Sequence, residues 1–103
     1  RIDRDGRYGF EPITRRARHA RELGVQVAWT AWHYGVPPGV DLFDDALVDR
    51  FASYCRALAL HLRPFHERHA PIYTPVNEPS FLSWAACETG LMHPHRGDRL
   101  DEG

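Results

Sequence analysis

Polar side chains that could act on a substrate stand at the ends of two short apolar segments. Asn77 and Glu78 follow one of these segments, and His33 ends the other. A carboxyl group held at such a point can act as a general acid that protonates a leaving oxygen. An imidazole can donate a hydrogen bond to a substrate hydroxyl. The pattern therefore indicates an enzyme site, although each residue also has a structural interpretation.

The structural alternatives concern the same residues. Glu78 could be an acid at the start of a helix that follows the strand. His33 could be a histidine whose ring is satisfied by backbone groups at the rim of a sheet. Pro79 follows Glu78 and disfavours a helical backbone there. We therefore expect an extended backbone that projects the carboxyl group from a fixed place.

The three tryptophans are candidates for stacking on a sugar ring, but isolated tryptophans more often pack in cores. We expect Trp29 in the core and Trp84 near the site, and both interpretations stay open for Trp32.

Metal ligation is not expected. His66 and His69 are one residue too close for the spacing of zinc proteases, and a third ligand is missing. Cys55 and Cys87 stand 32 positions apart and form neither a disulfide framework nor a zinc motif. We therefore predict no metal and no cofactor.

The elements that must position these residues follow from apolar periodicity and from glycine and proline placement. The predicted elements are a helix over 11–23, a strand over 24–33, a loop over 34–39, a helix from about residue 44 or 45 to about residue 68, and a strand over 70–77. A long helix between two strands implies a parallel crossover, which brings both strand ends to one edge of the sheet. The almost unbroken apolar character of 24–33 predicts a strand that is covered on both faces.

Local signals refine the second helix. Asp41, Asp44 and Asp45 stand at its start, where carboxylates cap free N–H groups. Pro64 interrupts the hydrogen-bond ladder, so the last turn is expected to be kinked or separate.

Composition excludes several classes of protein. The 103 residues allow one compact domain at most, and a net charge of −1 with interleaved acids and arginines gives no basic stripe for nucleic acid. No apolar run approaches the roughly 20 residues of a membrane span, and no signal peptide is visible. We expect a cytoplasmic protein, a disordered tail over 96–103, and a chain that is one piece of a longer protein. The oligomeric state is left open.

The run Thr74-Pro75-Val76-Asn77-Glu78-Pro79 resembles the Asn-Glu-Pro signature of clan A glycoside hydrolases, especially family one, the β-glucosidases and 6-phospho-β-glucosidases. The similarity spans roughly residues 6–95. The other segments that carry it are Gly24–Val27 with Trp32–Gly35, Val40–Phe43 with Val48–Ala52, and Asn77 through Trp84-Ala85-Ala86 to Gly90.

The resemblance implies an α/β fold, a piece of a (β/α)8 TIM barrel from helix 2 to the loop after strand 4. It implies a retaining β-glycosidase that hydrolyses O-glycosidic bonds of a small glycoside or oligosaccharide. Glu78 matches the acid/base, Asn77 the contact to the sugar 2-hydroxyl, and His33 a sugar hydroxyl contact. Tyr34 stands where the family usually has Trp, and Trp84 is expected on the leaving-group side.

One part of the family's site is missing. Retaining glycosidases need a second carboxylate about 5–5.5 Å from the first, as nucleophile. In the family it comes from the seventh strand, and no acid after Glu78 ends a strand here. A whole barrel takes about 250 residues, so we expect the acid/base half of the site, inactive alone. The alternatives are a non-catalytic carbohydrate-binding relative, a truncated product without function, or another clan A family.

Overall fold

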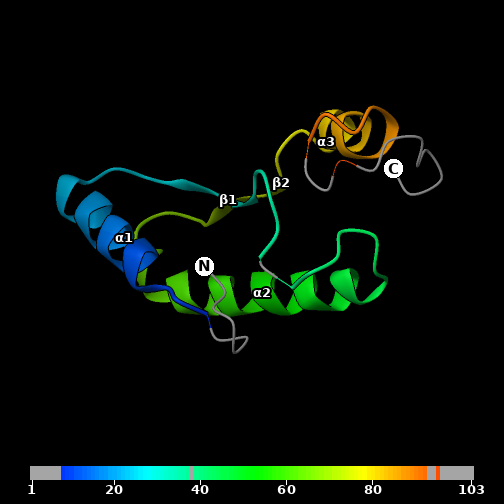
Figure 1. Ribbon diagram of the computed structural model, residues 1–103. Coiled ribbons are helices and arrows are strands. Elements are labelled where there is room, and N and C mark those ends of the chain that lie inside the picture. Colours follow the sequence, from blue (N-terminus) through cyan, green and yellow to red (C-terminus); the bar gives the residue numbers. More distant parts are fainter. Residues whose placement is uncertain (1–7, 38, 93–94, 96–103) are drawn as a thin grey trace.

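The computed structural model describes residues 8–37, 39–92 and 95 of the chain (Figure 1). The predicted tail over 96–103 lies outside these residues. The elements are the helix α1 (Glu11–Leu23), the strand β1 (Ala28–Trp32), the helix α2 (Ala46–Leu62), the 3-10 turn η1 (Arg63–Phe65), the strand β2 (Ile72–Val76), the short helix α3 (Pro79–Ser83) and the π-helical turn η2 (Trp84–Glu88).

Helix α1 has the bounds that the sequence predicts. Pro12 stands in its first turn, where the missing N–H costs no hydrogen bond. Gly24 ends the helix in a left-handed conformation with φ 69°. The Gly24 N–H donates to the Arg21 carbonyl at 3.2 Å, and the Val25 N–H donates to the Ala20 carbonyl at 2.9 Å. These paired bonds satisfy the last carbonyls of the helix and direct the chain toward β1.

The two strands pair in parallel, as predicted from the long helix between them. The ladder begins where Ala28 pairs with Ile72 and continues to the pair of Trp32 with Val76. Each strand is shorter than the predicted apolar segment, since β1 begins at Ala28 rather than Gly24 and β2 begins at Ile72 rather than Ala70.

Helix α2 starts after an aspartate cap and stops before a proline. The Asp44 side chain accepts a hydrogen bond from the Ala46 N–H at 3.0 Å. This bond satisfies a donor at the helix start. Pro64 lies in the separate turn η1 that follows the helix. The predicted break near Pro64 is therefore confirmed, and it sends the chain back toward β2.

Both long helices pack on one face of the sheet (Figure 1). The core cluster consists of Ala17 from α1 with Leu58 and Leu62 from α2, and Leu62 is fully buried. Trp29 of β1 and Tyr73 of β2 pack against this cluster from the sheet. Trp29, predicted in the core, packs against the core cluster but is only partly buried.

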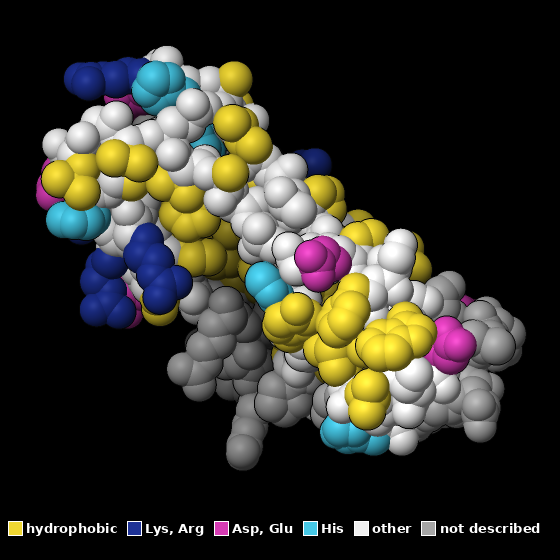
Figure 2. Space-filling model, turned by 90° about the horizontal axis from the view of Figure 1, so that it is seen from above, with side chains coloured by type: hydrophobic (Ala, Val, Ile, Leu, Met, Phe, Trp, Pro, Cys, Tyr) yellow, Lys and Arg dark blue, Asp and Glu magenta, His cyan; other side chains and the backbone are white. Residues whose placement is uncertain are grey.

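The other face of the sheet is not covered by a described element. Ala28 and Thr30 are exposed, whereas Trp29 between them is partly buried. The prediction of a strand covered on both faces is therefore wrong for this structure, because both helices lie on the same side. The side chain of Ile72 is 47% exposed, and Figure 2 shows that most of the exposed hydrophobic side chains on the upper side of the molecule gather at the end that carries α3.

The chain is less compact than a typical domain of its length. Its radius of gyration is 15.6 Å. A compact domain of 100 residues has a radius of gyration of about 13 Å. None of the helices in the described ranges has the length and apolar character required to cross a bilayer.

Candidate active site

The carboxyl ends of β1 and β2 place the predicted polar residues side by side. The Asn77 N–H donates to the Trp32 carbonyl at 2.8 Å, which extends the parallel ladder by one bond beyond the strands. The Asn77 side-chain Nδ2 lies 3.4 Å from His33 Nε2. In this pair the amide nitrogen donates. His33 and Asn77 are 44 positions apart in the sequence, so the crossover alone brings them together.

Glu78 follows this pair in an unusual backbone conformation. Its φ is 43° and its ψ is 62°, which is the left-handed helical region. The predicted extended backbone at Glu78 is wrong. Pro79 disfavours the right-handed helical region for the residue before it. The ladder holds the chain straight through Asn77, so the turn from β2 into α3 falls on Glu78 itself.

The Glu78 side chain is exposed and is not used by the backbone around it. Glu78 occupies the N-cap position of α3, but its carboxylate makes no capping hydrogen bond. Across the described ranges it also has no ion-pair partner. The structural alternative, an acid that caps a helix, has the right position but lacks the hydrogen bond. A carboxyl group in this state is available to a molecule at the strand ends.

Two aromatic rings border the site on the β1 side. The Tyr34 ring meets the His33 ring edge-on, with centroids 4.2 Å apart, and the Tyr34 side chain is 52% exposed. Trp32 has a structural role. Its indole N–H donates to the Gly35 carbonyl at 2.8 Å, and its ring lies 5.6 Å from the Phe51 ring. Trp32 thus fixes the loop that carries Tyr34.

A second aromatic pair follows Glu78. Trp84 and Phe81 have ring centroids 5.7 Å apart, and the side chains are 43% and 44% exposed. No ring contact or hydrogen bond joins the Trp84 side chain to His33, Asn77 or Glu78 among the described residues. Trp84 therefore lies outside the group formed by these three residues. Sequence reasoning did not single out Phe81. The spacing of three residues between Phe81 and Trp84 on a helical segment is the signal that finds the pair.

The segment that carries this pair is anchored by small buried side chains. Ala85, Ala86 and Cys87 in η2 are buried. The Thr89 N–H donates to the Trp84 carbonyl at 3.0 Å. This bond closes a wider turn than an α-helix has. The buried side of η2 leaves Trp84 on its outer side.

The site has one carboxylate at a strand end. Among the described acidic residues, Glu78 is the one that closes the β2 strand end, two positions after Val76. No three His, Cys, Asp or Glu side chains in the described part of the chain gather closely enough to hold a metal ion together. An exposed carboxyl group beside an imidazole and an amide can transfer a proton and hydrogen-bond hydroxyl groups.

Comparisons of the chain with protein-family models, with curated proteins and with solved structures found no match.

Proposed function

We propose that this chain forms part of the (β/α)8 barrel of a retaining β-glycosidase similar to family one, and that it carries the acid/base half of the site. The observation that carries the proposal is the position of Glu78. Its uncommitted carboxylate stands at the end of a parallel strand, next to the hydrogen-bonded pair of His33 and Asn77. Enzymes built on parallel α/β sheets keep their active sites at this end of the strands.

In the proposed reaction Glu78 transfers a proton twice. Its carboxyl group protonates the glycosidic oxygen while a carboxylate nucleophile attacks the anomeric carbon, and the leaving group departs as an alcohol. The Glu78 carboxylate then takes a proton from the water that displaces the nucleophile, which releases the sugar and restores both groups. The nucleophile is a carboxylate from another strand of the complete barrel, outside the described residues.

The neighbouring residues bind the substrate. His33 and Asn77 present an imidazole and an amide that hydrogen-bond sugar hydroxyls, and Asn77 is assigned to the 2-hydroxyl. The exposed Tyr34 ring offers an apolar face to the same sugar. Trp84 is assigned to the leaving-group side, because it lies on the segment that follows Glu78. The substrate class is a small glycoside or an oligosaccharide.

The second candidate function is carbohydrate binding without catalysis. The observation that favours it is the single strand-end carboxylate within the described ranges. The two functions share the sugar-binding residues and differ in whether Glu78 moves a proton.

Sugar binding is tested on the chain itself by titration with methyl β-D-glucoside, followed by two-dimensional amide NMR. We expect saturable shifts at Asn77 and His33, and a loss of about tenfold in affinity in His33→Ala, which removes a hydrogen bond. His69→Ala is the matched control, because His69 lies before β2, at the other end of the sheet. Shifts confined to other residues, or no saturable shifts, contradict carbohydrate binding by this chain alone.

Catalysis is tested in a chimera in which residues 8–92 replace the corresponding segment of a family-one β-glucosidase that keeps its own nucleophile. We expect Glu78→Gln to lower the rate on an alkyl glucoside by about 10²–10⁴-fold, and on a nitrophenyl glucoside much less, since that leaving group needs little protonation. Glu88→Gln in η2 is the control and is expected to leave both rates unchanged. An unchanged rate for Glu78→Gln on both substrates rejects the acid/base assignment and leaves carbohydrate binding.

A further inference from the structure

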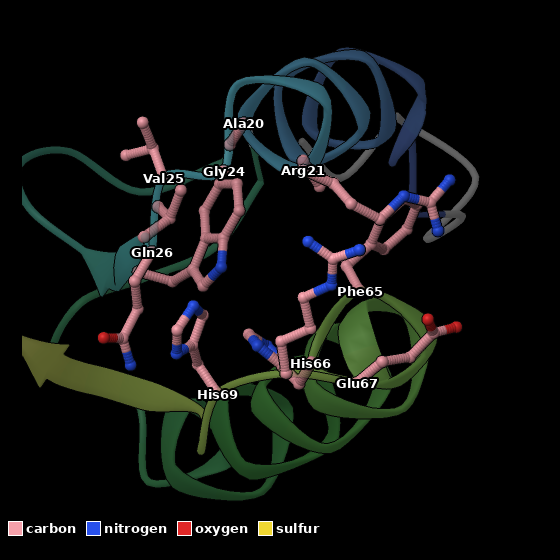
Figure 3. A pocket seen from close by; sticks show the side chains of 13 residues that line it. Ala20, Arg21, Gly24, Val25, Gln26, Phe65, His66, Glu67 and His69 are labelled. Atoms are coloured by element: carbon pink, nitrogen blue, oxygen red, sulfur yellow. The ribbon is translucent and has the colours of Figure 1, made fainter.

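A cavity of about 130 Å³ lies at the opposite end of the sheet from Glu78. Its walls are the end of α1, the segment that leads into β1 and the segment 65–69 that leads toward β2 (Figure 3). Each strand between this cavity and the candidate active site has five residues. A strand of that length spans roughly 17 Å. The cavity is therefore independent of the proposed glycosidase chemistry.

The floor of the cavity is apolar and aromatic. Trp29, Phe65 and Val27 line it and are partly buried, and Ala17 and Ala20 of α1 complete it. A cavity of about 150 Å³ is large enough for benzene, so the volume of this solvent-open cavity matches a ligand with a single ring. The indole N–H of Trp29 has no hydrogen-bond partner among the described residues. Buried indoles usually have one, so the floor offers both a surface for stacking and a free donor.

The rim of the cavity is cationic. Arg21 and Arg68 line it together with His66 and His69, against one acid, Glu67. In the described part of the chain the recorded ion pair joins His19 to Glu22, so neither guanidinium is neutralised by an acid there. Figure 3 shows Glu67 pointing away from the cavity. The charge that faces a ligand is therefore positive.

Several wall residues are held in place before any ligand binds. The Arg21 guanidinium lies 5.0 Å from the centroid of the Phe65 ring. This is a cation–π arrangement. His66 Nε2 is 3.3 Å from the Tyr73 hydroxyl, and Gln26 Nε2 donates to the Ala70 carbonyl at 3.1 Å. Preorganised groups lose little freedom when a ligand arrives.

We propose that this cavity binds a small aromatic carboxylate. The ring lies on the Trp29 side of the floor, and the carboxylate accepts hydrogen bonds from the guanidinium group of Arg68, while the guanidinium of Arg21 over the Phe65 ring adds positive charge nearby. A planar guanidinium matches the two oxygens of a carboxylate. Small anions with no flat apolar body would leave the floor without contacts, so the ring and the charge are both required.

The test uses benzoate as probe on the full chain, with benzyl alcohol and acetate as the matched neutral ring and the matched ringless anion. We expect saturable binding of benzoate by calorimetry and NMR, with a Kd of about 1 mM, as is ordinary for so small a ligand. Benzyl alcohol and acetate are expected to bind at least about tenfold more weakly, because benzyl alcohol lacks the carboxylate and acetate lacks the aromatic ring.

Two variants locate the binding. Arg68→Gln is expected to weaken benzoate about tenfold. Arg56→Gln, on the exposed side of α2, is the control and leaves the affinity for benzoate unchanged. Ala20→Leu fills the cavity with a good helix former and is expected to abolish binding while α1 persists in circular dichroism.

Three results would overturn the proposal: equal affinity for benzoate and benzyl alcohol, absence of saturable binding, or equal losses in Arg68→Gln and Arg56→Gln. Glu78→Gln is expected to leave benzoate binding unchanged, so the outcome does not depend on the proposed function.

Discussion

Replacing Glu78 by glycine removes the Cβ atom from a residue whose φ is 43°, and we expect the folded state to become more stable. The left-handed conformation costs an L-residue about 1–2 kcal/mol relative to the right-handed one, whereas glycine adopts it at no such cost. Glycine also gains about 0.5–1 kcal/mol of conformational entropy in the unfolded chain, which offsets part of this relief. The net gain in the free energy of unfolding is therefore about 0.5–1 kcal/mol for Glu78→Gly.

The exposed carboxylate adds little to this balance, because within the described ranges it has no hydrogen bond or ion pair to lose. The assay is urea unfolding followed by circular dichroism. The free energy of unfolding falls by about 1–2 kcal/mol per M of urea, so the urea midpoint of Glu78→Gly is expected to rise by about 0.5 M.

Two variants control the measurement. Glu78→Ala keeps the Cβ atom, so its midpoint is expected to stay within about 0.3 M of the parent. Ala52 lies at an exposed position inside α2. Ala52→Gly places a glycine in a right-handed helix and is expected to lose about 1 kcal/mol. A lower midpoint for Glu78→Gly, or an equal rise for Glu78→Ala, would refute the assignment of backbone strain to Glu78.

Three further predictions concern the scaffold. Leu62 is fully buried, whereas Leu60 on the same helix is 54% exposed. Leu62→Ala is expected to cost about 3 kcal/mol in urea unfolding and Leu60→Ala less than about 1 kcal/mol, and equal losses would contradict the location of the core. Asp44 accepts a hydrogen bond from the start of α2, whereas Asp45 makes no capping bond. Asp44→Ala is therefore expected to cost about 1 kcal/mol in the same assay, and Asp45→Ala is expected to be nearly neutral. Burial raises the pKa of Tyr54 above its ordinary value of 10.0. The unfolded chain therefore loses this proton first, and stability that is complete below about pH 10 is expected to fall as the pH rises further. In Tyr54→Phe the free energy of unfolding is expected to fall less steeply with pH, in unfolding curves measured from mildly to strongly alkaline pH. An unchanged dependence on pH would show that other groups cause the loss of stability.

The elements were predictable where neighbouring residues determine the conformation. Helix α1 has its predicted bounds, because Pro12 suits a first turn and Gly24 supplies a left-handed end. The break at Pro64 follows from a missing N–H, and the parallel pairing of β1 with β2 follows from the length of the helix between them. The polar residues at the strand ends were predictable for the same reason, since a parallel crossover brings both ends to one edge.

Other features depend on contacts between distant parts of the chain. The sequence indicates that Pro79 restricts the backbone conformation of Glu78. It does not indicate which of the remaining conformations Glu78 adopts. The hydrogen bond from the Asn77 N–H to the Trp32 carbonyl keeps the chain in the ladder as far as Asn77, so the chain turns at Glu78. The covered face of the sheet depends on both helices crossing to the same side, which no local pattern specifies.

The cavity at the far end of the sheet also depends on contacts between distant parts of the chain. The sequence alone gives Arg21 no part in a site, and His66 and His69 are one residue too close for the zinc-protease motif. In the structure these residues line one pocket together with Trp29, because the end of α1 and the segment before β2 meet there. The sequence by itself determined the helices, their ends and the parallel order of the strands, since these depend on residues a few positions apart. The tertiary structure alone decided the backbone of Glu78, the open face of the sheet and the lining of the cavity, because each depends on packing between residues far apart in the chain.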